Sequence, residues 1–179
     1  MARKYAKDYR LETRLNVSGR QETVAVYEGA YYFFPCSAQE LKAQKVRCAV
    51  FAVLADLFLA ALLVFSDHFH PEHRFLVLPE ALSVLPAGIV LNCVSAFCFA
   101  NKPVERRVRD KLANTFPAAA LALAILASLS VCAQLAQPLL HGWSAPSVWL
   151  LACAACFAAA SWRLFLLRGR LKPQEVPAA

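Results

Sequence analysis

Residues 46–66 read VRCAVFAVLADLFLAALLVFS, a nearly unbroken apolar run of the kind that crosses a membrane. Three more apolar stretches follow, at about 75–100, 115–140 and 148–167, and each of the four has at least 20 residues. A helix that rises about 1.5 Å per residue needs roughly 20 residues to cross a hydrocarbon core about 30 Å thick. None of the stretches alternates as a strand would, and only helices and closed barrels satisfy their backbone in lipid. The sequence therefore predicts an all-α membrane protein with a bundle of four transmembrane helices.

The composition and length agree with this interpretation. Of the 179 residues, 59% are hydrophobic and 17% are charged, whereas soluble domains average about 45–50% and about 25%. These values exclude a disordered chain, a collagen-like chain and a disulfide scaffold. The length favours one compact unit. We expect a cytoplasmic N-terminal segment at 1–36, the bundle at 37–172 and a disordered tail at 173–179.

The basic residues predict the orientation of the bundle. Eighteen of the 19 lie before the first stretch, between the second and third, or at the end of the fourth and beyond, and the other two connections hold only Arg74. Positive residues stay on the cytoplasmic side, so both termini should be cytoplasmic and the protein should lie in the plasma membrane. The bias argues against a dual-topology dimer, which needs near balance. The net charge of +7 follows from it; it fits a surface that faces the anionic inner leaflet and does not indicate a nucleic-acid partner.

Residues 9–17 alternate apolar or neutral side chains with polar ones, which predicts a strand with one covered face. Ser18-Gly19 provides a turn, and residues 23–27 are rich in the β-branched and aromatic side chains of a return strand. The register stays open, since loops of different length pair Leu15 with Thr23 or with Val24. An isolated hairpin is marginal in water, so this one should lean on the membrane surface, the cytoplasmic loop or a partner.

The segment between the hairpin and the first stretch carries two further signals. Residues 31–34 read YYFF and predict either an interfacial anchor or a strand end that packs on the hairpin. Ser37-Ala38-Gln39-Glu40 is a capping-box pattern, so a helix should begin here and run into the first span. No signal peptide is predicted, since the apolar run begins after about 45 residues and is too long for an h-region.

Residues 101–114 predict a short helix that lies flat on the inner leaflet. Glu105–Arg109 and Arg106–Asp110 have the spacing of helical ion pairs. The alternative is an extension of the third span into water. One apolar stripe repeats at four-residue spacing, at Val104, Val108 and Leu112. The basic residues expected to face lipid are Arg106, Arg107, Arg109 and Lys111.

Asp56 stands near the middle of the first span, roughly 15 Å from its inner boundary. A carboxyl group there costs about 2.5–3.5 kcal/mol on insertion scales, so it must be protonated, paired or facing water. Asn92 in the second span lies at a similar depth, and we hypothesise a hydrogen bond between the two side chains. Three roles stay open for Asp56: a structural polar clamp, ion or proton coupling, and recognition of a charged span in a partner.

Glu80 lies near the outer end of the second span, between Pro79 and Pro86. Prolines kink helices and free backbone carbonyls. A kinked helix with an acid at its mouth would line a vestibule. The alternative is an irregular helix with no such role.

Histidines and cysteines raise two further possibilities. The outer loop holds His68, His70 and His73 with two acids, a set that would bind Zn²⁺ or another divalent ion if the loop brought it together; the alternative is an ordinary polar loop. Cys153 and Cys156 form a CxxC in the fourth span, which resembles four-helix thiol oxidoreductases of the vitamin K epoxide reductase kind. The loop cysteines that relay electrons in those enzymes have no counterpart here, so small residues in a packing face are the alternative.

Small residues at four-residue spacing let helices approach closely. Such rows predict that the third and fourth spans pack together or dimerise. They comprise Ala118 and Ala122 in the third span, and Ala152, Cys156 and Ala160 in the fourth. The chain has no phosphate-binding loop, HExxH motif, nucleophile elbow or pair of catalytic carboxylates, so we expect neither an enzyme nor a cofactor.

Three short segments resemble a group of small four-span membrane proteins of Gram-positive bacteria. They are YEGAYY at 27–32, the two Leu-Pro pairs at 78–79 and 85–86, and PVERR at 103–107. Glu80 departs from the pattern, in which an aromatic residue follows the proline. The resemblance implies four spans and a cytoplasmic hairpin, and no activity.

These signals together favour a membrane-embedded accessory or scaffold subunit. It would use the hairpin, the basic loop and the third and fourth spans for a protein partner or a second copy. One alternative is a small transporter or channel component that uses Asp56, and another is a thiol redox protein that uses Cys153 and Cys156.

Overall fold

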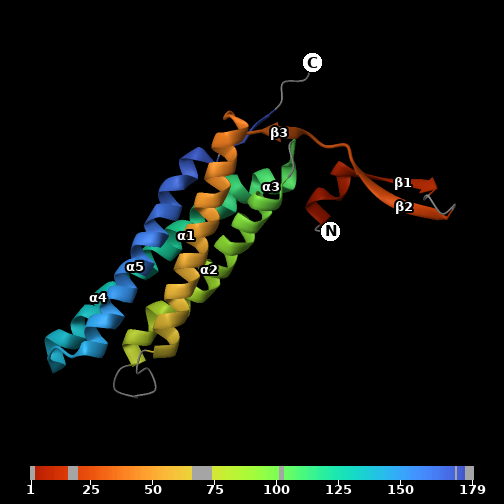
Figure 1. The fold of residues 1–179 in the computed structure, drawn as a ribbon. Coiled ribbons are helices and arrows are strands. Elements are labelled where there is room, and N and C mark those ends of the chain that lie inside the picture. The colour runs from red at the N-terminus through yellow and green to blue at the C-terminus, as the bar shows by residue number, and fades with distance from the viewer. Residues whose placement is uncertain (1–2, 16–19, 66–73, 101–102, 172, 176–179) are drawn as a thin grey trace.

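The computed structural model describes residues 3–15, 20–65, 74–100, 103–171 and 173–175. Its long helices are α1 (Ala38–Phe65), α2 (Arg74–Phe99), α4 (Phe116–His141) and α5 (Ala145–Leu167), shown in Figure 1. Four helices of the described chain are long and apolar enough to cross a membrane. The predicted four-helix bundle is therefore confirmed, and its composition is compatible with an integral membrane protein.

The helices form a ring in which α1 contacts α2 and α5, and α4 contacts the same two helices. The interior is filled by large side chains that are fully buried, among them Leu62, Phe97, Phe116 and Phe157. Each helix also exposes large apolar side chains on the outside of the bundle. Examples that are more than 60% exposed are Leu57, Leu85, Leu139 and Leu166. Burying a leucine is worth about 1.5–3 kcal/mol, so this outer surface suits lipid better than water.

The most extensive helix contact is between α4 and α5, which confirms that the third and fourth spans pack together. Of the predicted rows only Ala160 is buried, whereas Ala118, Ala122, Ala152 and Cys156 are exposed. The other buried alanines of α4 and α5 lie on neighbouring stripes, including Ala120, Ala124, Ala127 and Ala154. Alanines are so frequent in both helices that four-residue spacing occurs on several faces, and spacing alone could not select the buried one. Dimerisation through the exposed rows stays a prediction.

The helix ends follow local sequence signals. Ser37 and Glu40 form the predicted capping box: the Glu40 carboxylate accepts from the Ser37 N–H at 2.9 Å, and Ser37 Oγ accepts from the Glu40 N–H at 3.2 Å. Gly142 follows α4 with a φ of 89°, a conformation that only glycine adopts cheaply. A second capping box, between Ser144 and Ser147, starts α5. The tight turn at Gly142 thus sets α5 antiparallel to α4.

The loop after α2 continues directly into the third span. Helix α3 (Arg106–Asp110) is followed by a π-helical turn (Lys111–Thr115) and then by α4 without a break. The prediction of a separate helix lying flat on the membrane surface is therefore wrong. The alternative prediction, that the third span extends back through this loop as one helix, is confirmed. The reason is that Leu112 is buried at 1% exposure and Phe116 at 0%, so the apolar stripe of the loop packs into the bundle.

The N-terminal segment begins with a 3₁₀ helix (Arg3–Asp8) and forms the predicted hairpin. Strand β1 (Tyr9–Leu15) pairs antiparallel with β2 (Gln21–Tyr27). Leu15 pairs with Gln21, so both registers considered from the sequence are wrong. Both assumed that the return strand begins at residue 23, whereas it begins at residue 21.

A second small sheet closes the bundle. Strand β3 (Tyr31–Phe33) lies between β4 (Val104–Glu105) and β5 (Gln174–Glu175). Tyr32 and Phe34 are buried at the bundle end, whereas Tyr31 and Phe33 are exposed. Tyr31 also packs edge-on against Tyr27 of the hairpin, and the interfacial anchor stays a prediction. Because β3 offers a free edge to residues 174–175, the predicted disorder of the tail is wrong there; residues 176–179 lie outside the described chain.

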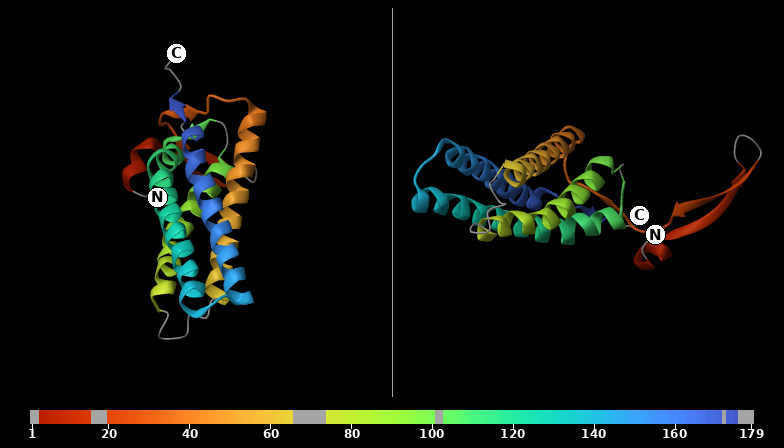
Figure 2. Two further views of the ribbon diagram at one scale, coloured as in Figure 1. Left: turned by 90° about the vertical axis from the view of Figure 1, so that its left-hand side faces the viewer. Right: turned by 90° about the horizontal axis from the view of Figure 1, so that it is seen from below.

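Both termini and the three-stranded sheet lie at the same end of the bundle, which we call the terminal end (Figure 1). The hairpin does not cover the helices. It projects away from them at this end, as the right view of Figure 2 shows. The fold therefore presents one separate element, the β1–β2 hairpin, beyond an otherwise compact bundle.

Candidate functional site

A cluster of tyrosines and charged residues fastens the N-terminal segment to the terminal end of the bundle. We call it the junction, and it consists of Tyr5, Asp8, Tyr9, Tyr27, Glu105, Arg106 and Asp110. The 3₁₀ helix and the hairpin base supply one half, and β4 and α3 supply the other. Its two halves are thus far apart in the sequence.

Between described residues, three hydrogen bonds join the two halves. Tyr9 Oη donates to Glu105 Oε2 at 2.6 Å, and Tyr5 Oη donates to Asp110 Oδ2 at 3.1 Å. The backbone N–H of Arg106 donates to Tyr27 Oη at 3.0 Å. Hydrogen bonds to charged groups each contribute about 1.5–3 kcal/mol, so the junction offsets the intrinsic weakness of a two-stranded hairpin.

Charge pairs complete the junction. Arg106 Nη1 lies 3.7 Å from Asp8 Oδ1, and Arg109 Nη1 lies 3.1 Å from Asp110 Oδ1. The Arg109 guanidinium also stacks over the Tyr32 ring at 5.1 Å. The predicted pairs Glu105–Arg109 and Arg106–Asp110 are therefore wrong. The N-terminal segment supplies a tyrosine for Glu105 and a carboxylate for Arg106, and neither could be seen from the loop alone.

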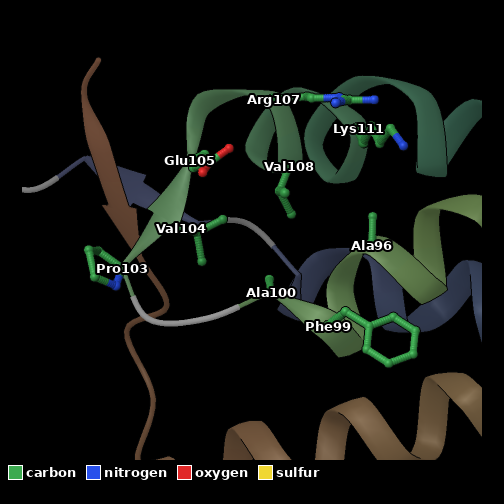
Figure 3. A pocket seen from close by; sticks show the side chains of 9 residues that line it. All are labelled: Ala96, Phe99, Ala100, Pro103, Val104, Glu105, Arg107, Val108 and Lys111. Atoms are coloured by element: carbon green, nitrogen blue, oxygen red, sulfur yellow. The ribbon is translucent and has the colours of Figure 1, made fainter. Parts of the chain in front are cut away.

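Arg107 and Lys111, the other two of the four residues expected to face lipid, line a pocket of about 310 Å³ beside the junction. Figure 3 shows Arg107 and Lys111 on the α3 side of this pocket, across from Ala96 of α2 and Ala100 just beyond it. Lys111 Nζ donates a 2.6 Å hydrogen bond to the amide oxygen of Asn92. Arg106, Arg109 and Lys111 therefore contact protein groups. Of the four residues expected to face lipid, Arg106 and Arg107 are exposed and the other two are half-buried.

The carboxylate of Glu105 raises the pKa of Tyr9 to about 12, because the phenol must keep its proton to donate the hydrogen bond; burial adds to the shift. Burial also raises the pKa of Tyr27. Both tyrosines should stay neutral at physiological pH, so the junction holds its hydrogen bonds under ordinary conditions.

Strong alkali should open the junction. Since the pKa of Tyr9 is higher in the folded protein than the ordinary tyrosine value of 10.0, the stabilisation is fully present below pH 10 and is lost as the pH rises through about 12. We expect the phenolate absorbance of the wild type minus that of Tyr9→Phe to titrate near pH 12. Glu105→Gln should move that titration toward pH 10. A wild-type difference titration already centred at pH 10 would contradict the Tyr9–Glu105 bond.

Beyond the junction, the hairpin is exposed on both faces. Opposite residues of an antiparallel pair share a face, and the register places Leu11 beside Ala25 on the face that carries Tyr9 and Tyr27. We call this the Leu11 face. Leu11 is 72% exposed. The other face pairs Glu12 with Val24 and carries charged residues, so the two faces differ in chemistry.

Glu80 occupies a different environment from the vestibule mouth suggested by the sequence. It is completely buried and faces α4. There Ser130 Oγ and Gln134 Nε2 both donate to Glu80 Oε1, at 3.0 and 2.9 Å. We call these three residues the Glu80 cluster. The vestibule interpretation is therefore wrong, because an acid in a bundle needs hydrogen-bond donors and the neighbouring helix supplies them. The cluster ties α2 to α4.

Asp56 and Asn92 do not make the hypothesised hydrogen bond within the described chain. The Asn92 oxygen is bonded to Lys111, a charged donor that competes well for it. Asp56 is half-buried in a groove of about 270 Å³ between α1 and α2, beside Ala87 and Gly88. The groove opens on the outside of the bundle, so Asp56 stays a candidate for recognition of another membrane span.

Replacing Asp56 by Asn should leave the protein folded and inserted. The substitution keeps the volume and removes the group that costs about 2.5–3.5 kcal/mol to insert. We expect the yield in membranes and the unfolding midpoint in detergent to equal or exceed those of the wild type. Ion flux in liposomes that the wild type supports and Asp56→Asn abolishes would instead favour the transporter alternative.

The predicted metal site and the predicted thiol pair gain no support from the described residues. His68, His70 and His73 lie outside the described residues, and the described part of the chain contains no other cluster of three potential metal ligands. Cys153 is buried and Cys156 is exposed, and both thiols are free. The CxxC thus lies across two sides of α5, one in the core and one on the outer surface.

Sequence reasoning missed the junction and the partners of Glu80. Two signals were present: Glu105 and Asp110 are acids inside a basic loop, and tyrosines flank both ends of the hairpin. In the third span, Ser130 and Gln134 stand four residues apart and therefore on one helix face. Neither pattern identifies a site by itself, because the residues that complete each site lie in a distant segment of the sequence.

Comparison of the chain with protein-family models, with curated proteins and with solved structures gave no match. The resemblance to small four-span proteins of Gram-positive bacteria therefore stays a prediction. The function must be argued from the geometry of the bundle, the junction and the hairpin.

Proposed function

We propose that the chain is a multi-pass protein of the plasma membrane with both termini in the cytoplasm. The distribution of basic residues supports this orientation. Of the 17 basic residues in the described chain, 16 lie in segments that meet at or near the terminal end, whereas Arg74 begins α2 at the opposite end. Basic residues flanking spans are retained on the cytoplasmic side, so the terminal end is the cytoplasmic one.

Reporter fusions test this orientation. A reporter that is active only in the cytoplasm should work at residue 1 and at residue 179, and should be silent when inserted between α1 and α2. A reporter that is active only outside should give the reverse pattern. Equal activity of either reporter on both sides would contradict a single orientation.

We infer that the protein acts as a non-enzymatic accessory or scaffold subunit whose hairpin binds a cytoplasmic or membrane protein. One observation carries this inference: the hairpin is fastened at its base by the junction, yet its outer part projects away from the helices (Figure 2). A two-stranded hairpin gains little stability from itself. The junction holds the β1–β2 hairpin away from the bundle, and this arrangement supports a role of the hairpin in binding a partner.

The chemistry of the hairpin suggests how a partner would bind. Both strands have a free edge, since β1 and β2 form a sheet of their own. An extended segment can add to such an edge through backbone hydrogen bonds, while alternate side chains give specificity. The Leu11 face offers an apolar anchor next to that edge. We therefore propose a protein partner that adds a strand and covers Leu11.

Affinity purification from native membranes in mild detergent tests the scaffold role. The full chain should retain a partner in a fixed ratio, and a variant with residues 11–25 replaced by a short Gly-Ser linker should lose it. Tyr9 and Tyr27 stay in that variant, so the junction and the bundle should be unaffected. Retention of the same partner by the shortened variant would contradict the hairpin as the binding element.

A further inference from the structure

Three arginines surround one cavity at the terminal end of the bundle. Arg47 of α1, Arg163 of α5 and Arg170, just beyond α5, line a space of about 350 Å³. The rest of the lining is apolar and comes from Phe51, Leu166 and Leu167. We call this space the arginine cavity. It lies on the α1–α5 side of the bundle, so it is distinct from the junction.

Within the described chain, no acidic side chain forms an ion pair with the arginines of the arginine cavity. Ion pairs between described residues engage Arg10, Arg14, Arg106 and Arg109, and none of the cavity arginines. All three arginines are exposed, so the space is open at the surface of the bundle. Like charges placed around one small space repel each other. An anion in the cavity would offset that repulsion, and guanidinium groups match phosphate oxygens with paired hydrogen bonds.

In the proposed orientation, the arginine cavity would lie near the level where headgroups meet hydrocarbon. Arg163 is four residues from the end of α5, about 6 Å along the helix, and Arg47 stands at the predicted start of the first span. Long arginine side chains at such positions reach toward the headgroups while their stems cover apolar surface. Leu166, next to the cavity, is 65% exposed on the outside of the bundle. Charge and apolar surface thus meet at one place.

We propose that the arginine cavity binds the phosphate headgroup of an anionic phospholipid of the cytoplasmic leaflet, with an acyl chain lying along α1 and α5. The apolar part of the lining favours an amphiphile over a free phosphate ion. The pocket of Figure 3 is a weaker candidate, because its lining includes the acid Glu105 and its Lys111 is already bonded to Asn92. The proposal rests on the membrane orientation inferred above.

Lipid retention tests the proposal with the full chain. The purified protein would be equilibrated with equal amounts of phosphatidylglycerol and phosphatidylcholine of identical acyl chains, and the bound lipid counted by native mass spectrometry. We expect a preference for phosphatidylglycerol of roughly a hundredfold, since each basic residue near an anionic lipid surface adds about fivefold. R47Q/R163Q/R170Q should lose that preference. The charge-matched variant R10Q/R14Q/R20Q, changed only in the hairpin segment, should keep it.

Three results would overturn the proposal. Equal retention of both lipids by the wild type would show no anionic site, and equal losses in both triple variants would show a bulk charge effect. Displacement of the lipid by inorganic phosphate alone would assign the site to a free anion. R47K/R163K/R170K keeps the charge and should retain part of the preference, which controls for misfolding of the glutamine variant. An error in the proposed membrane orientation can be distinguished from an error in the lipid proposal, because the reporter fusions would reveal it.

Discussion

A single substitution in the hairpin, Leu11→Asp, should abolish recovery of the protein partner. Leu11 is 72% exposed on the face that continues from Tyr9 and Tyr27. Burying a leucine against a partner contributes about 1.5–3 kcal/mol, which corresponds to roughly a tenfold to hundredfold change in affinity, and a buried aspartate would add a desolvation cost. We expect at least a tenfold fall in the amount of partner retained per bundle.

Val24→Asp is the matched control for this prediction. Val24 is 39% exposed and lies on the opposite face of the same hairpin, across from Glu12. Val24→Asp introduces the same negative charge in the neighbouring strand. Any general weakening of the hairpin should therefore appear in both variants. Equal losses of partner would mean that the face assignment is wrong. Loss with Val24→Asp alone would move the binding surface to the charged face.

Removing both donors of the Glu80 cluster should have the largest effect on stability. S130A/Q134L takes away the two hydrogen bonds to Glu80 Oε1 while the carboxyl group stays buried. Hydrogen bonds between membrane helices contribute about 0.6–2 kcal/mol each, and a desolvated acceptor adds to the cost. We expect a loss of about 2–4 kcal/mol in the free energy of unfolding, measured by denaturation in detergent.

The triple variant E80L/S130A/Q134L separates a hydrogen-bond effect from a packing effect. Replacing a whole buried polar group by apolar side chains is often neutral, whereas breaking it is costly. The triple variant should therefore recover most of the stability that S130A/Q134L loses. Glu80→Gln, which keeps an acceptor, should lie close to the wild type. A triple variant less stable than the double variant would contradict the role assigned to the cluster.

The bundle could be predicted from the sequence because its signal is local. Apolar length decides a span, and the Ser37–Glu40 capping box marks the start of the first helix within four residues. The same holds for the hairpin, where alternation and a turn are both visible. Its register could not be predicted, because the residue at which the return strand begins is fixed by pairing and not by composition.

The junction could not be predicted because it joins distant segments. Tyr9 and Glu105 are 96 positions apart, and nothing in either neighbourhood indicates the other. Asn92 illustrates the same limit: depth in the membrane suggested Asp56 as its partner, but the extended third helix brings Lys111 closer. Depth places two residues on one level, whereas helix rotation decides which side chains meet.

Photocrosslinking in native membranes is the most direct test of the hairpin as a binding element. A photoreactive residue at position 11 of the full chain, with a second variant carrying it at position 24, would be irradiated and the adducts identified by mass spectrometry. We expect position 11 to yield one defined protein adduct and position 24 to yield little. Adducts with lipid only, or no protein adduct at position 11, would contradict a partner bound at the hairpin.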